Sequence, residues 1–216
     1  MKMRHFLIGA AVCLALFSAP CAMQAQFAGT GPRDNFRDTT ILRPPAGAKV
    51  ALIVFEDLGC PACARAHPFE VEAEKETHVA LLRYDFPIAA HVWTFEGAVC
   101  ARYIQEMISP ELADEFRSAV FASQSMISDE DDLHQFMSKW LAEHGKKMPA
   151  AIDPTGKLAK EVSADRELGR RLNVEWTPTV VVVTRDNYQV VCGTKDGAND
   201  PAQITAVVKA AMEQAH

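Results

Sequence analysis

The motif Cys60-Pro61-Ala62-Cys63 constrains this chain more than any other feature of its sequence. It follows residues 50–55, a compact apolar run rich in β-branched residues that is typical of a buried strand. It precedes residues 64–76, whose composition favours a helix. Cys60 is therefore predicted at a helix N-terminus, with Pro61 in the first turn, where unpaired N–H groups and the helix dipole favour a thiolate. Because the thiolate is the reactive form of cysteine, the motif predicts redox chemistry.

Zinc binding is the alternative for these two thiols, since the same spacing supplies half of a structural zinc site. The sequence contains no second close pair of cysteine or histidine ligands, and His67 alone lies on the same predicted helix. We therefore favour a redox pair. We expect no metal and no cofactor beyond the redox-active disulfide of Cys60 and Cys63 themselves.

The N-terminus has the order of a secretory signal: basic residues within the first four positions, an apolar stretch over residues 6–17, and small residues up to 25. The apolar stretch is shorter than the roughly 20 residues that span a bilayer as a helix. We expect residues 1–25 to be a signal peptide, with cleavage after Ala22 as a competitor. Pro20 makes Cys21 a poor lipidation site. This predicts an exported, for example periplasmic, protein.

Removal of that segment would take Lys2 and Arg4 from the 22 basic residues and leave all 28 acidic ones, so the net charge becomes −8. Such an acidic balance disfavours nucleic acid and anionic membranes as partners and favours proteins. Four of the six cysteines would remain, in an oxidising compartment. The 191 residues left are enough for one domain with an inserted subdomain.

The rest of the chain predicts an α/β protein. Residues 26–48 are a polar, Pro/Gly-rich lead-in, and residues 79–86 are a second strand stopped by Pro87, which completes a parallel β-α-β unit. Residues 91–172 contain no convincing strand and predict three or four helices. The boundaries of those helices are predicted at Ser109-Pro110, Ser128, Gly145 and Asp153-Pro154.

Towards the C-terminus, residues 179–183 and 189–192 flank Asp186-Asn187 and predict an antiparallel hairpin. A final helix is expected near Asp200-Pro201. The predicted fold class is a mixed sheet flanked by helices.

Three segments resemble the DsbA-type branch of the thioredoxin superfamily: residues 55–63 around the cysteines, Asp85-Phe86-Pro87, and Thr177-Pro178-Thr179. The resemblance implies a thioredoxin-like domain made of residues 49–90 and 173–216, interrupted by a helical insertion over residues 91–172.

The resemblance also implies roles for particular residues. Cys60 is the exposed attacking sulfur and Cys63 the buried resolving one, with Pro61 and Ala62 shaping the site. Pro178 is held cis opposite the cysteines, whereas an isolated X-Pro bond is usually trans. The backbone of Thr177, directly before it, pairs with an extended substrate strand.

One position departs from the family. Members of the family usually have a buried acid six residues before the first cysteine, but this chain has Val54 there. Glu56 points to the same face of the strand by alternation and is a candidate proton relay for Cys63. The alternatives are that Glu56 is an ordinary exposed acid at the strand end and that water carries the proton.

Cys100 and Cys192 leave three options open: a structural disulfide, two buried free thiols, or an electron relay. We favour the structural disulfide, because the predicted compartment is oxidising.

Together these features predict a thiol:disulfide oxidoreductase that introduces disulfides into exported proteins carrying thiols. The resemblance implies regeneration by a membrane redox partner, and we expect a monomer. A reductase or isomerase with the same fold is the main alternative, and a non-catalytic module that binds a soft metal is a more distant one.

Overall fold

The computed structural model describes residues 35–193 and 200–215. The predicted signal peptide and residues 26–34 of the predicted lead-in lie outside the described residues. The described strands are β1 (Val50–Glu56), β2 (Ala80–Asp85), β3 (Thr179–Thr184) and β4 (Tyr188–Cys192). The described α-helices are α1 (Pro61–Thr77), α2 (Thr94–Met107), α3 (Pro110–Ser123), α4 (Glu130–Glu143), α5 (Lys157–Leu172) and α6 (Ile204–Gln214). Three short 3₁₀ helices are η1 (Thr39–Ile41), η2 (Gln124–Met126) and η3 (Pro201–Gln203).

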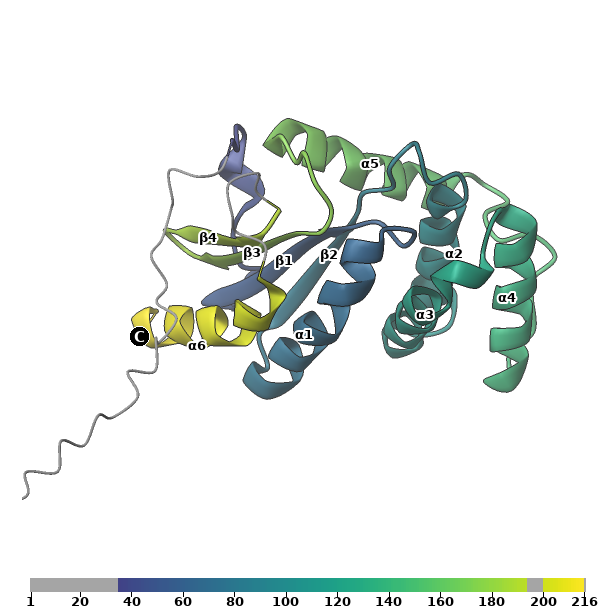
Figure 1. Cartoon of the computed structure of the whole chain (residues 1–216), viewed down its shortest axis with the longest axis horizontal. Coiled ribbons are helices and arrows are strands. Elements are labelled where there is room, and N and C mark those ends of the chain that lie inside the picture. The colour runs from purple at the N-terminus through teal and green to yellow at the C-terminus, as the bar shows by residue number, and fades with distance from the viewer. Residues whose placement is uncertain (1–34, 194–199, 216) are drawn as a thin grey trace, which may run out of the picture.

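The strands form one mixed sheet in the order β2-β1-β3-β4 (Figure 1). β1 and β2 are parallel and are joined through α1, whereas β3 is antiparallel to both β1 and β4. The predicted β-α-β unit and the C-terminal hairpin are both confirmed. β1 lies inside the sheet with all seven residues buried, as its apolar composition predicted.

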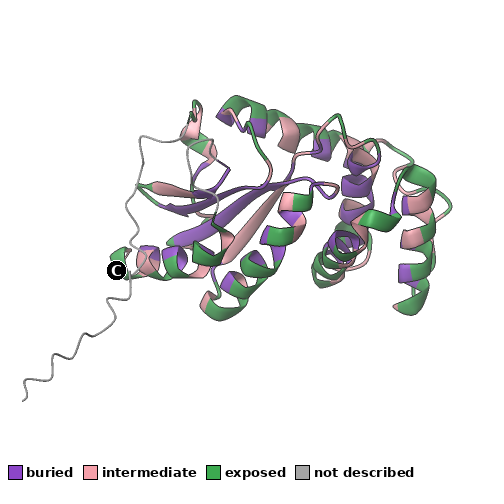
Figure 2. Cartoon of the chain, in the orientation of Figure 1, coloured by how far each residue is buried: buried purple, intermediate pink, exposed green. Residues whose placement is uncertain are grey.

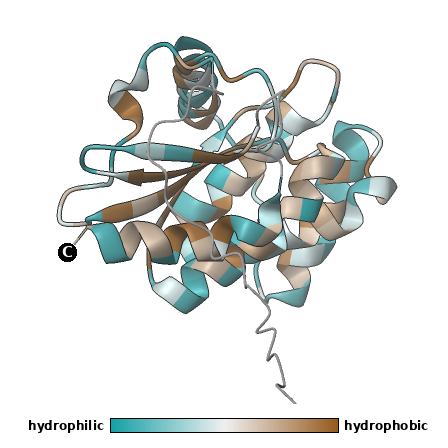
Figure 3. Cartoon of the chain, turned by 60° about the vertical axis from the view of Figure 1, so that its left-hand side comes forward, coloured by the Kyte–Doolittle hydropathy of each residue, from teal (hydrophilic) through white to brown (hydrophobic). Residues whose placement is uncertain are grey.

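Alternation along β1 divides the core between the two faces of the sheet. Val50, Leu52 and Val54 pack with buried residues of α1 and α6, whereas Ile53 and Phe55 face the layer that contains the end of α5. Figure 2 shows β1 and β3 buried along their length, while the helices each expose one side. Figure 3 shows the matching pattern of apolar strands beneath helices that turn polar residues outward.

The segment between β2 and β3 holds four α-helices, as predicted, and it has a core of its own built around Phe116, Met137 and Trp140. The same core includes Cys60 and Cys63, so the motif lies where the insertion meets the sheet. The last helix of the segment, α5, reaches back over the sheet. A Cβ added at Gly169 would lie 2.5 Å from the ring of Phe86, which shows how closely α5 approaches the end of β2.

Two predicted helix starts are wrong. Ser109 caps α3 as expected, because its hydroxyl accepts from the N–H of Leu112. However, α4 is capped by Asp129 rather than Ser128, since the Asp129 carboxylate accepts from the N–H of Asp132. The Asp153-Pro154 segment forms a turn instead of a helix start, and α5 begins only after Gly156, at φ +69°.

Within residues 35–193 and 200–215, none of the helices combines the length and the apolar character needed to cross a membrane.

Candidate active site

Cys60 is the N-cap residue of α1, with Pro61 at the first helical position, as predicted. Its thiol donates a hydrogen bond to the carbonyl oxygen of Thr177, with Sγ and O 3.3 Å apart. The Thr177–Pro178 peptide bond is cis. The fold therefore brings the loop before β3 against a cysteine that lies 117 residues earlier in the chain.

The surroundings of Cys60 lower the pKa of its thiol from 9.0 to about 5. The largest cause is a hydrogen bond from the thiol of Cys63, and burial opposes it. A hydrogen bond from the side chain of Thr177 and the backbone N–H groups of Ala62 and Cys63 lower the pKa further. The Thr177 hydroxyl is buried and has no hydrogen-bond partner among residues 35–193 and 200–215 while Cys60 is protonated, so it can donate when Cys60 ionises. Thr177 therefore interacts with Cys60 in both protonation states: its carbonyl accepts from the thiol, and its hydroxyl donates to the thiolate.

Cys63 has the opposite character. Burial raises the pKa of its thiol well above 9.0, and the neighbouring Cys60 adds to the rise. Its sulfur accepts the backbone N–H of Asp57, 3.5 Å away, which is the largest opposing cause. Neutral at ordinary pH, Cys63 is the sulfur that stays protonated while Cys60 ionises.

The expectation of an exposed Cys60 is only partly met. Cys60 keeps 8 % of its surface and Cys63 keeps 1 %, so Cys60 is the more accessible thiol but is largely covered. The reason is that the helical insertion packs its core against the start of α1.

Two side chains missed by the sequence analysis fix the loop before Cys60. The buried carboxylate of Asp57 accepts from the N–H groups of Gly59 and Ile88, at 2.7 and 2.6 Å, and lies 3.0 Å from His91 Nδ1. The amide of Gln124, from the insertion, donates to the carbonyl of Cys60 at 3.0 Å. The spacing Asp57-x-Gly59 is a local signal of a turn in which Asp accepts an N–H two residues on. Gln124 has no local signal.

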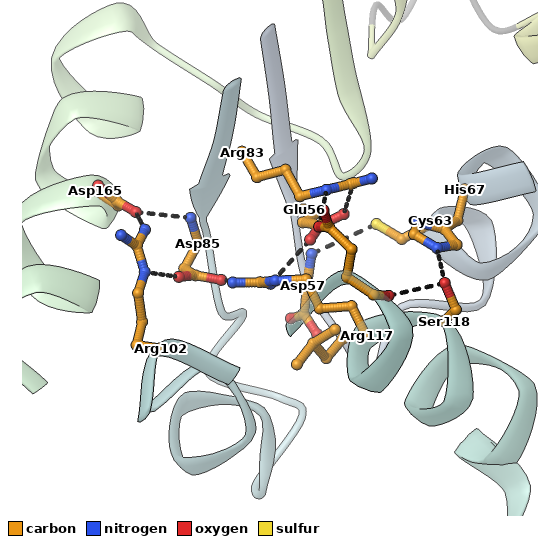
Figure 4. Close-up of polar contacts among 12 residues, drawn as sticks. Glu56, Asp57, Cys63, His67, Arg83, Asp85, Arg102, Arg117, Ser118 and Asp165 are labelled. Carbon is orange, nitrogen blue, oxygen red and sulfur yellow. Dashed lines mark hydrogen bonds and ion pairs between the residues drawn. The ribbon is translucent and has the colours of Figure 1, made fainter. Parts of the chain in front are cut away.

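Glu56 is buried and lies on the α1 face of the sheet, as alternation predicted, so it is not an exposed acid at the strand end. Figure 4 shows its carboxylate held between two arginines. One oxygen accepts from Arg83 of β2 at 3.0 Å and the other accepts from Arg117 of α3 at 2.9 Å. Both oxygens are thus engaged, which leaves the carboxylate poorly placed to carry a proton for Cys63.

These ion pairs continue into a largely buried layer that extends away from Cys63 (Figure 4). Arg83 also pairs with Glu70 of α1 at 3.0 Å, and Arg117 pairs with Asp85 of β2 at 2.8 Å. Arg102 of α2 joins Asp85, 2.7 Å away, to Asp165 of α5. We call this set the ion-pair layer; its members are Glu56, Glu70, Arg83, Asp85, Arg102, Arg117 and Asp165.

Burial raises the pKa of Glu70 to about 7, even though Arg83 acts in the other direction. His67, one turn earlier on α1, is buried rather than on the surface, and burial lowers its pKa to about 4. Its Nε2 lies 2.7 Å from the hydroxyl of Ser118. His67, Glu56 and Glu70 could together offer three ligand atoms to a metal, but both carboxylates already bind guanidinium groups.

Cys100 and Cys192 do not form the predicted disulfide. Both are buried free thiols. Cys100 lies on α2 in the core of the insertion, whereas Cys192 lies on β4 in the core between the sheet and α6. In Figure 1, β4 lies at the left edge of the sheet, whereas α2 lies on the other side of the sheet, next to α4. Two cysteines in separate cores cannot reach the Cα separation of under about 7 Å that a disulfide needs.

A family model described as Thioredoxin matches residues 38–210. The fold is also shared with solved structures at low sequence identity. The thiol-disulfide exchange protein alpha-DsbA2 from Wolbachia pipientis aligns over 80% of this chain and 85% of its own, with 19% identity and a TM-score of 0.60. BdbD from Bacillus subtilis aligns over 80% and 90%, with 16% identity and a TM-score of 0.60.

ScsC from Proteus mirabilis aligns over 79% of this chain and 71% of its own, with 19% identity and a TM-score of 0.60. No curated protein sequence matches the chain. The common fold confirms the predicted thioredoxin-like sheet with its helical insertion, and it is the fold that DsbA proteins adopt. With most of its length matched by the family model, the chain belongs to the thioredoxin family.

Proposed function

We propose that this protein is an exported thiol:disulfide oxidoreductase that introduces disulfides into other exported proteins through Cys60 and Cys63. The observation that carries the proposal is the division of the two thiols: the pKa of Cys60 falls to about 5, whereas that of Cys63 rises. Neighbouring thiols with such different pKa values are suited to disulfide exchange, because one is a good leaving group and the other stays protonated.

In the proposed reaction the protein starts with a Cys60–Cys63 disulfide. A substrate thiolate attacks the sulfur of Cys60, so that a mixed disulfide forms, the Cys60–Cys63 bond breaks, and Cys63 leaves as a thiolate that takes up a proton. A second substrate thiolate then attacks the substrate sulfur of the mixed disulfide and releases Cys60 as a thiolate. The substrate loses two electrons and gains a disulfide, while the protein becomes a dithiol.

The stability of the reduced protein determines the proposed direction, which is oxidation of the substrate. Reduction produces a Cys60 thiolate that accepts hydrogen bonds from Cys63, Thr177 and the N-terminus of α1. These interactions are absent from the disulfide, so they stabilise the reduced protein and make the oxidised one a stronger oxidant. Because Glu56 is held by two arginines, we propose water as the carrier of the Cys63 proton.

Exposed apolar side chains on three loops near the site support a protein substrate. Trp176 directly precedes Thr177, Met126 is two residues from Gln124, and Val92 follows His91. These three side chains are between 51 and 69 % exposed, which is unusual for large apolar residues, and they suit contact with an unfolded chain. We propose that such a chain also pairs with the backbone at Thr177. We further propose a monomer regenerated by a membrane redox partner.

The reduction potential of the Cys60–Cys63 pair tests the proposal. A potential near about −120 mV is expected for an oxidant of DsbA type, whereas about −270 mV belongs to a reductase of thioredoxin type. The two values differ by about 7 kcal/mol, at about 1.4 kcal/mol per 30 mV. Equilibration with glutathione redox buffers measures the potential directly, and a value at the lower end would overturn the proposed direction.

A further inference from the structure

A second group of side chains with metal-binding chemistry lies away from Cys60, between α2 and α4. Glu96 and Cys100 are four residues apart and therefore on one face of α2, and His134 faces them from α4. One ligand atom from each residue lies within 4.8 Å of the other two. His134 Nε2 and Glu96 Oε1 are 3.0 Å apart.

The three side chains differ in depth. Cys100 is completely buried, whereas the side chains of His134 and Glu96 keep 39 % and 26 % of their surface. The sulfur is therefore the innermost ligand atom of the cluster, and the imidazole and carboxylate lie closer to the surface. The two outer ligands are therefore in contact with solvent, whereas the thiol is not.

A comparison with Glu56, His67 and Glu70 shows why the α2–α4 cluster is the better metal site. In the former group, Arg83 and Arg117 already neutralise the carboxylates. Among the described residues, the only ion-pair partner of Glu96 is His134, and a neutral imidazole is itself a ligand. No permanent cation has to be displaced.

We propose that Glu96, Cys100 and His134 form a zinc-binding site that joins α2 to α4, separate from the redox pair. Zinc prefers this mixture of thiolate, imidazole and carboxylate in tetrahedral geometry. With bond lengths of about 2.0–2.3 Å, tetrahedral ligand atoms lie roughly 3.3–3.8 Å apart, so binding needs only small side-chain shifts: His134 and Glu96, now 3.0 Å apart, move slightly apart, and no ligand atom starts more than 4.8 Å from another. The sequence gives no local sign of such a site, because His134 lies 34 residues after Cys100 and only the fold brings them together.

Glu130 is available as a fourth ligand. It precedes His134 by one turn of α4 and is exposed, and it lies outside the group of ligand atoms within 4.8 Å, so it or a water molecule would supply the fourth bond. On binding, the Cys100 proton passes to solvent and the thiolate and Glu96 carboxylate neutralise the two charges of the ion. Zinc bound there would also occupy the sulfur of Cys100 as a ligand.

Cobalt titration tests the proposal, because Co²⁺ occupies zinc sites and its bond to a thiolate absorbs strongly in the near ultraviolet. The Cys60→Ser/Cys63→Ser protein without residues 1–25, which carry Cys13 and Cys21, is used, so that any thiolate band comes from Cys100 or Cys192. We expect saturation at one ion per chain, with the band removed by excess Zn²⁺. Absence of a band, or a band that persists after Cys100→Ser, would overturn the proposal.

Since Cys100 is a core residue, His134→Ala provides a second test at a half-exposed position. It should weaken Zn²⁺ binding by more than the roughly 10–100-fold that loss of an outer-shell partner costs. It should also abolish the rise in melting temperature that Zn²⁺ gives the parent protein. Gln135→Ala, next to it on α4, and Cys192→Ser are matched controls that should leave both readouts unchanged. Equal binding by His134→Ala and its parent would contradict the site, and Glu130→Gln shows whether that carboxylate or water completes it.

Discussion

The two sides of the cysteine motif hold charge in different ways. On the side formed by Thr177 and the start of α1, which we call the front, neutral donors stabilise the Cys60 thiolate. These donors are a thiol, a hydroxyl and the N–H groups at the start of α1. Behind, the ion-pair layer sets three guanidinium groups against four carboxylates. The charge on Cys60 appears and disappears with the redox state, whereas the ion-pair layer is present in both redox states.

The difference suggests that the two sides have separate roles, one in redox chemistry and the other in stability. Neutral dipoles can stabilise a transient thiolate without leaving an unpaired cation when the disulfide forms. The ion pairs, which are present in both redox states, instead join the insertion to the sheet. Arg102 and Arg117 come from the insertion, and they bind Glu56 and Asp85 from the strands. Substitutions in front should therefore change redox chemistry, and substitutions behind should change stability. Each prediction below can break that separation.

The largest effect is expected at the two cysteines. Cys60→Ala should abolish disulfide exchange, because no sulfur remains to accept the substrate thiolate. Cys63→Ala should still react with an oxidised substrate through its Cys60 thiolate and should accumulate mixed disulfides, since no resolving thiol releases them. Turnover assays and non-reducing electrophoresis check both. Cys192→Ala is the control and should keep full turnover; exchange by Cys60→Ala would refute the mechanism.

Arg117→Met should have the largest effect on stability. Arg117 is buried and pairs with Glu56 and Asp85 at 2.9 and 2.8 Å, so its loss removes one of the two guanidinium partners of each of these buried carboxylates. Breaking a buried pair in this way costs about 3–5 kcal/mol, which urea unfolding measures. Arg170→Met is the matched control, since its pair with Glu167 is exposed and 3.9 Å long, and it should change stability by less than about 0.5 kcal/mol.

The same Arg117→Met protein also tests the separation itself. Its Cys60–Cys63 reduction potential should change little, because the one member of the layer that acts on either thiol is Glu56, which is the last of the causes that raise the pKa of Cys63 and keeps Arg83 as a partner. A large shift in potential would show that the ion-pair layer takes part in the redox chemistry.

Glu70 gives the layer a pH dependence. Its pKa is about 7 in the folded protein and about 4.5 as the ordinary value, so the folded state binds the proton more tightly. A raised carboxyl pKa means that stability is highest below about pH 4.5 and falls as pH rises towards 7. Unfolding free energies between pH 5 and 8 should therefore fall more steeply for the parent than for Glu70→Gln. The difference should be at most about 3 kcal/mol, at about 1.4 kcal/mol per unit; parallel profiles would contradict the assigned shift.

Local patterns predicted the elements that carry the site. The apolar run of β1 and the placement of Cys60 before a helix are properties of neighbouring residues, and both are confirmed. The position of Thr177-Pro178 opposite Cys60 needed the family resemblance, because no local pattern links residues 117 positions apart.

Contacts between distant segments explain what the sequence could not predict. Gln124 reaches the carbonyl of Cys60 across 64 positions, and Arg117 reaches Glu56 across 61. Such side chains resemble ordinary polar surface residues until the fold brings their partners near. The predicted disulfide is wrong for the same reason, since an oxidising compartment says nothing about which core each cysteine enters.

The smallest effect is expected at Thr177, and it tests the front side most directly. Thr177→Val removes the hydroxyl that donates to the Cys60 thiolate but keeps the side-chain volume and the carbonyl that accepts from the thiol. Because a hydrogen bond to an ion is worth about 1.5 kcal/mol, the pKa of Cys60 should rise by about one unit, as thiolate absorbance during a pH titration would measure. The same free energy makes the pair less oxidising by about 30 mV. Thr177→Ser retains the donor and should behave like the parent. If Thr177→Val left both the pKa and the potential unchanged, the helix terminus and Cys63 alone would account for the thiolate.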